Sequence, residues 1–72
     1  RGGGAQSKRD FISKMAIASK EARETHYWLR LFRDSKICPN LSLTALLSDS
    51  EELIRILTSI VKTGQEKLKR QF

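Results

Sequence analysis

The sequence contains very few of the residues that stabilise small proteins by cross-linking. Its 72 residues include one cysteine, Cys38, and one histidine, His26, so neither an intramolecular disulfide nor a zinc site built from cysteine and histidine is available. A single hydrophobic core in a chain this short rarely supplies more than about 3–5 kcal/mol. Because the chain also begins at Arg1 rather than methionine, we expect a segment of a larger helical domain, stabilised by oligomerisation or by further sequence.

Long apolar runs are missing as well. The longest uninterrupted runs span three to four residues, far fewer than the roughly 20 needed to cross a bilayer. The start of the chain has no secretory signal of basic, apolar and small residues. We therefore expect a cytoplasmic protein with no membrane partner, and a single cysteine is compatible with a reducing compartment.

Charge is plentiful and unbalanced. The chain has 14 lysines and arginines against 8 acidic residues, a net charge of +6. Residues 1–36 hold nine of the basic and four of the acidic residues, whereas residues 37–72 hold five and four. The excess positive charge therefore lies in the first half, which favours an acidic partner such as a nucleic acid or an acidic protein surface.

The apolar pattern predicts a first helix over residues 8–33. Three glycines before it indicate a flexible junction at residues 1–6, and Ser7 and Asp10 have the spacing of a helix start. Apolar or small residues then alternate in steps of four and three, which is a heptad seam. The seam residues are Phe11, Met15, Ala18, Ala22, Thr25, Leu29 and Phe32.

A second helix is predicted over residues 41–62 or longer, after a loop at residues 34–40 that contains Pro39. Asn40 or Ser42 would cap it. Its predicted seam is Leu43, Leu46, Ser50, Leu53, Leu57 and Ile60, and a flanking apolar row is Leu47, Ile54, Val61 and Leu68. Acid-then-base pairs such as Asp10 with Lys14 and Glu51 with Arg55 support the helices. The predicted fold is all-α, an antiparallel helical hairpin.

The first helix has more apolar surface than one partner helix can cover. Ile12, Ile17, Trp28 and Leu31 lie off its predicted seam, on more than one side. Leaving several such side chains in water would forfeit several kcal/mol at about 25 cal/mol per Å². We therefore expect the helix to touch at least two neighbours, as in a bundle or in an oligomer of bundles.

The basic residues of the first helix are the main functional candidates. Arg9, Arg23 and Arg30 share one heptad position, so they line one face. Such a row either neutralises nucleic-acid phosphates or is a solvated face that pairs with acidic residues such as Glu51 and Glu52. The candidates for nucleic-acid contact are Arg9, Lys14, Lys20, Arg23, Arg30 and Arg33.

The middle of the first helix combines aromatic and acidic side chains. Tyr27 and Trp28 would suit base stacking, but aromatic residues at helical spacing more often serve packing. His26 has no acidic or cysteine neighbour three or four residues away to orient its ring. We assign no catalytic, cofactor-binding or metal-binding residue, and interpret Cys38 as an inert loop thiol. The residues assigned to packing or an interface are Glu21, Glu24, Tyr27, Trp28 and Leu31.

Two segments carry a family resemblance. The run from Ser7 to Phe32, with E-A-R-E-T-x-Y-W-L at Glu21 to Leu29, and the run E-E-L-I-R-I-L-T-S-I-V-K-T at Glu51 to Thr63 closely resemble the four helix bundle proteins encoded in intervening sequences of bacterial 23S rRNA genes. A related branch is the accessory protein of diversity-generating retroelements, which works with a reverse transcriptase.

The resemblance implies that residues 7–72 are helices three and four of an up-down four-helix bundle, within a homo-oligomer such as a pentamer. It brings no catalytic motif and no cofactor. Our leading hypothesis is a non-enzymatic, self-associating protein whose basic helix face binds RNA or DNA phosphates. The alternative is a protein-interaction scaffold or adaptor, for example for a reverse transcriptase, with no direct nucleic-acid role.

Overall fold

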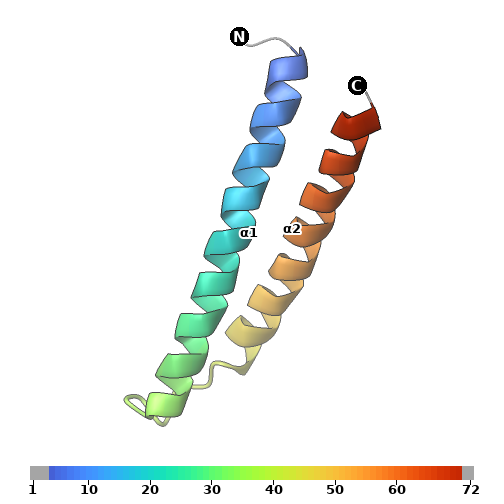
Figure 1. The fold of residues 1–72 in the computed structure, drawn as a ribbon. Coiled ribbons are helices and arrows are strands. Elements are labelled where there is room, and N and C mark those ends of the chain that lie inside the picture. The colour runs from blue at the N-terminus through green and yellow to red at the C-terminus, as the bar shows by residue number, and fades with distance from the viewer. Residues whose placement is uncertain (1–3, 71–72) are drawn as a thin grey trace.

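The protein forms a hairpin of two long antiparallel helices, α1 (Gly4–Ser35) and α2 (Thr44–Arg70), which lie side by side (Figure 1). The structure is a computed structural model that describes the backbone of residues 4–70 and the side chains of residues 7–70. The hairpin is elongated, with extents of 52 × 23 × 15 Å. The predicted all-α antiparallel hairpin is confirmed.

Helix α1 extends beyond both predicted ends. It begins at Gly4, so residues 4–6 of the predicted junction are helical, which agrees with the high helix propensity of Ala5 and Gln6. Residues 1–3 of that junction lie outside the described residues. At the other end, Asp34 and Ser35 are helical, and the Ser35 Oγ donates to the Phe32 carbonyl at 2.7 Å.

The helix ends in a left-handed residue. Lys36 has a φ of 59°, a conformation that glycine adopts easily and that other residues adopt at a cost. Its amide donates to the Arg33 carbonyl at 3.3 Å, and the Ile37 amide donates to the Ser35 Oγ at 3.3 Å. The chain leaves α1 through these contacts, two residues later than the sequence predicts.

Helix α2 begins three residues later than predicted. The Leu41 amide donates to the Cys38 carbonyl at 3.0 Å, which closes a turn with Pro39 at its second position. The turn uses the residues that the sequence assigned to the helix start. The Leu43 carbonyl accepts the first helical bond, from the Leu47 amide at 2.8 Å, so Leu43 takes the capping position predicted for Asn40 or Ser42. The helix then continues through Gly64 to Arg70.

The interface keeps part of each predicted seam, because Leu43, Ser50 and Leu57 on α2 and Ala22 on α1 are buried as predicted. On α2, Leu47 is buried and Ile54 half-buried, whereas Leu46 and Leu53 of the predicted seam are exposed. Thus the row predicted as flanking takes the place of Leu46 and Leu53, and it faces α1 beside the rest of the predicted seam. On α1, Phe11 of the predicted seam is exposed. The buried residues of the interface are Ser19, Ala22, Leu43, Leu47, Ser50 and Leu57.

Small residues let the two helices approach closely along this interface. Ser19, Ala22 and Ser50 are buried at the interface, and small side chains let two helices approach closely. Gly64 continues the same pattern, because a Cβ added there would lie only 2.7 Å from Cγ1 of Ile12. Ile12 therefore lies in the interface and is half-buried, which corrects its placement off the seam.

Much apolar surface stays uncovered by the hairpin. No described side chain is fully buried. Ile17, Trp28 and Leu31 are exposed, as predicted for residues off the seam. Within residues 4–70, neither helix is long and apolar enough to cross a membrane. The exposed large apolar residues are Phe11, Ile17, Tyr27, Trp28, Leu31, Ile37, Leu41, Leu46, Leu53 and Ile56.

Candidate functional site

One flank of the hairpin, along the junction of the two helices, is polar and rich in basic side chains. Arg9, Arg23 and Arg30 lie in one row along α1, with Ala16 between the first two. Three hollows follow this row, and residues of both helices line each of them. We call this flank the basic groove and define it by its basic lining residues, which are Arg9, Arg23, Arg30, Arg33, Lys62 and Lys69.

The middle of the groove is held by a bond between the helices. The Nη2 atom of Arg23 donates to Oγ1 of Thr58 at 2.7 Å. Both residues line the same hollow, together with Lys62 and Gln65. Because a guanidinium has five N–H donors, this bond orients the Arg23 head and leaves donors for a further acceptor.

The end of the groove near the loop contains a second interhelical contact. Nε2 of His26 lies 3.1 Å from Oε2 of Glu51, and His26 is half-buried. The sequence offered His26 no partner on its own helix, and the partner comes from α2 instead. Glu51 was predicted to pair with Arg55, but Arg55 bonds Glu52, because the position of Glu51 beside α1 turns its carboxylate toward His26.

Arg30 and Arg33 line the hollow that also contains His26 and Glu51. The Nε of Arg33 donates to Oδ1 of Asp34 at 2.9 Å. This hydrogen bond is the main cause that lowers the pKa of Asp34, and the positive charges of Arg33, Arg30 and Lys36 lower it further. Three basic side chains, those of Arg30, Arg33 and Lys36, thus lie near Asp34 at this end of the hairpin.

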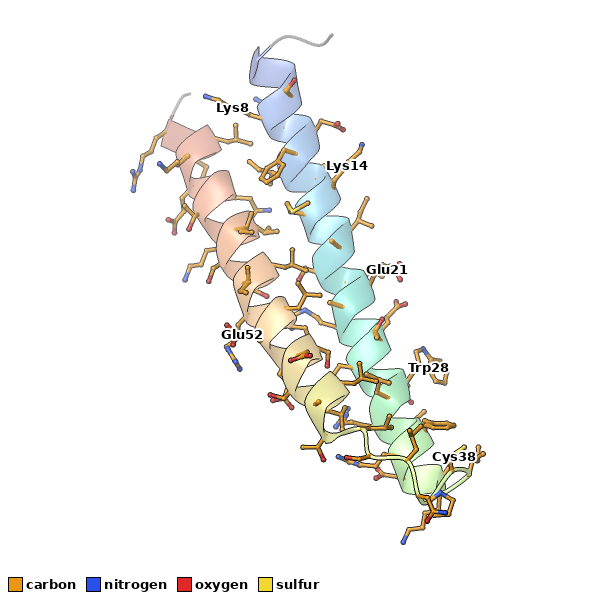
Figure 2. The ribbon with its side chains drawn as sticks, turned by 180° about the vertical axis from the view of Figure 1, so that it is seen from behind. Lys8, Lys14, Glu21, Trp28, Cys38 and Glu52 are labelled. Carbon is orange, nitrogen blue, oxygen red and sulfur yellow. The ribbon has the colours of Figure 1, made fainter. Side chains whose placement is uncertain are left out.

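The structure gathers only some of the predicted nucleic-acid contacts. Arg9, Arg23, Arg30 and Arg33 line the groove, and Lys20 lies one row further out, since it precedes Arg23 by three residues. Lys14 points away from α2 with Glu21 and Trp28 (Figure 2). It is paired with Asp10 at 3.1 Å, which confirms that predicted pair. Glu24 is exposed, so it has no buried ion pair within the hairpin.

Helix α2 contributes lysines to the groove that the sequence pattern did not indicate. Lys62 and Lys69 lie seven residues apart on α2 and line the hollow that contains Arg9. Their spacing is the signal that could have identified them, but only a correct rotation of α2 brings this row beside the arginines. Among the lining residues, Glu51 and Glu66 are the acidic ones.

The opposite flank is apolar. On the other side of the interface from the basic groove, Phe11 on α1 and Leu46 and Leu53 on α2 are large apolar side chains that are exposed. Trp28 and Ile56 lie one row further out on their helices and extend this surface. Near the loop, Trp28, Leu29, Phe32 and Ile37 line a hollow on this side. We define the apolar face by its exposed helical residues, which are Phe11, Trp28, Leu46, Leu53 and Ile56.

The described residues contain little that would support catalysis. Within residues 7–70, no group of three or more histidine, cysteine or acidic side chains is arranged to hold a metal ion. Cys38 is a free, exposed thiol in the loop. The arginine side chains of the basic groove are of the type that forms paired hydrogen bonds with phosphate or carboxylate oxygens.

Comparisons with known proteins agree with the resemblance carried by the two sequence segments. Neither a curated protein nor a solved structure matches the chain. The family model described as 23S rRNA-intervening sequence protein matches residues 1–59. Because this match spans most of the 72 residues, the chain belongs to the 23S rRNA-intervening sequence protein family.

Proposed function

We propose that the protein binds the phosphate backbone of RNA or DNA through the basic groove. The function of its family is not established, so the proposal depends on the geometry of this chain. The observation that supports it is the convergence of basic side chains from both helices on one flank, where Glu51 and Glu66 are the acidic lining residues. A groove with this excess of positive charge attracts a polyanion.

The dimensions of the groove suit an extended polyanion. From Arg9 to Arg30 the row spans 21 residues, which is about 31 Å at 1.5 Å per residue. With phosphates about 3.4 Å apart along the axis of each duplex strand, that length corresponds to about nine nucleotides. Guanidinium groups bind phosphate oxygens through two parallel hydrogen bonds, so each arginine of the row is suited to one phosphate.

The salt dependence of binding tests the proposal. Replacing Arg9, Arg23 and Arg30 by Gln should reduce the slope of log K against log salt by about 0.7–0.9 for each lost phosphate contact, or about 2–3 in total. Binding would be measured by fluorescence anisotropy with labelled RNA and DNA strands. If the unmodified protein binds neither at about 50 mM salt, the proposal is wrong.

A control with the same net charge separates the groove from general attraction. Its three changes remove basic residues that do not line the groove. The slope should fall clearly less in this control than in the groove variant, and an equal fall would contradict a role for the groove. The control substitutions are Lys14→Gln, Lys67→Gln and Arg70→Gln.

We also propose that the apolar face mediates self-association with another copy of the chain. Leu46 and Leu53 are 54% and 47% exposed on a helix, and full burial of a leucine contributes about 1.5–3 kcal/mol. Among residues 7–70 no side chain is fully buried, so the hairpin gains much of its missing core if a second copy covers this face. The resemblance likewise implies a homo-oligomer.

Sedimentation of one variant and its control tests self-association. Leu53→Gln should shift the protein toward smaller species, because it places an amide in the apolar contact. Ile17→Gln is the matched control, since Ile17 is similarly exposed but does not belong to the apolar face. An unmodified protein that is monomeric contradicts self-association and favours the adaptor alternative, in which a different protein covers the face.

A further inference from the structure

Tyr27 lies beside the basic groove, although the proposed phosphate contacts do not use it. It follows Arg23 by four residues and precedes Arg30 by three, so it is a surface neighbour of both, with Cβ atoms about 5–6 Å apart. Glu24 and Leu31 are its neighbours on the side away from the groove. Tyr27 is therefore an aromatic side chain bordered by cations on its groove side.

The Tyr27 ring is supported and partly open. Its centroid lies 5.2 Å from that of Trp28, and the two ring planes are inclined at 73°, an edge-to-face arrangement. One neighbour in this arrangement covers at most one face of the tyrosine ring. Because Tyr27 is 49% exposed, its ring surface is available to a flat ligand.

We infer that Tyr27 stacks on a base and that the basic groove takes single-stranded rather than double-stranded nucleic acid. This inference rests on the proposed function, because the arginines must first hold the backbone. Bases of a single strand are free to stack on an aromatic ring, whereas those of a duplex are already stacked inside the helix. A bound duplex would leave the exposed Tyr27 ring, which borders Arg23 and Arg30, without a base to stack on.

The positions of the charges define how a strand lies. Arg23 and Arg30 are seven residues apart, which is about 10.5 Å along α1. At about 3.4 Å per nucleotide, their guanidinium groups hold phosphates about three nucleotides apart, and the base that stacks on Tyr27 belongs to a nucleotide between them. The Glu24 carboxylate, on the outer side of Tyr27, repels the backbone and keeps it in the groove.

Binding of an oligothymidylate strand and of a duplex of equal length tests the inference. Tyr27→Leu should weaken binding of the strand about 5- to 140-fold, the range for the loss of one base–aromatic stack, and should leave duplex binding unchanged. Tyr27→Phe should bind the strand as the unmodified protein does, because the ring and not the hydroxyl stacks. Trp28 is the one tryptophan of the sequence, so its fluorescence provides a second measure of stacking on the adjacent ring.

Phe11→Leu is the matched control, since Phe11 is also an exposed aromatic residue of α1, at 53%, but lies on the apolar face. It should not affect binding of the strand. The inference is wrong if Tyr27→Leu weakens binding of the strand no more than Phe11→Leu does. The proposed function still stands in that case if the variant with Arg9, Arg23 and Arg30 replaced by Gln shows a reduced salt dependence of binding. If neither strand nor duplex binds at low salt, both are wrong.

Discussion

The close approach of Gly64 to Ile12 makes a quantitative prediction about stability. A Cβ at position 64 would lie 2.7 Å from Cγ1 and 2.8 Å from Cδ1 of Ile12. Carbon atoms prefer to be about 3.5–4.0 Å apart, so Ile12 would have to move by roughly 1 Å. Its branched side chain is held in the interface, and such overpacking costs about 1–3 kcal/mol.

Gly64→Ala also has a favourable effect, because alanine in a helix interior is about 0.8–1.0 kcal/mol better than glycine. The free energy of unfolding should therefore fall by about 0–2 kcal/mol in the otherwise unmodified chain. In a protein that also carries Ile12→Ala the clash is gone, so Gly64→Ala should raise the free energy of unfolding by about 1 kcal/mol. The double-mutant cycle should thus give a coupling of about 1–3 kcal/mol between the two sites.

Urea unfolding, followed by far-ultraviolet circular dichroism, gives the free energy of unfolding of the unmodified protein, the two single variants and the double variant. All four are measured at one protein concentration, because the apparent stability of an associating protein depends on its concentration. Thr63, an exposed neighbour on α2, supplies the control, because Thr63→Ala against Thr63→Gly isolates helix propensity. If Gly64→Ala stabilises the protein equally with and without Ile12, the two helices do not approach each other at this point and the reasoning is refuted.

Three further predictions concern the loop and the groove. Lys36→Gly should raise the free energy of unfolding by about 1 kcal/mol, because glycine adopts the left-handed backbone conformation without strain. If urea titration instead gives a lower free energy of unfolding, the backbone of Lys36 is not left-handed. Thr58→Val should lower the free energy of unfolding by about 0.5–1.5 kcal/mol, because the hydrogen bond from Arg23 is lost. Thr58→Ser keeps the hydroxyl and should leave the free energy of unfolding unchanged. Arg33→Gln should raise the pKa of Asp34 toward its ordinary range, as measured by NMR titration, since the Arg33 hydrogen bond is the main cause of the lowering. Because the lowered pKa belongs to the folded state, this contribution to stability is present above the ordinary pKa and is lost as pH falls through the lowered one; an Asp34 pKa that does not change contradicts the assignment.

Some of the candidate site follows from the first helix alone. Arg9, Arg23 and Arg30 share a heptad position, and any α-helix through them places them in one row. The participation of Lys62 and Lys69 depends instead on how α2 is rotated against α1. Similarly, no local pattern links His26 to Glu51, which is 25 residues away in sequence.

The sequence by itself determined two amphipathic helices, a turn at Pro39 and a surplus of positive charge in the first half, because periodicity, proline geometry and charge act locally. Only the tertiary structure decided which of two adjacent apolar rows on α2 faces α1. That choice depends on the close approach of helices at small residues such as Ala22, Ser50 and Gly64, and it involves both helices together. The same rotation places Leu46 and Leu53 on the apolar face and the lysines of α2 beside the arginines of α1.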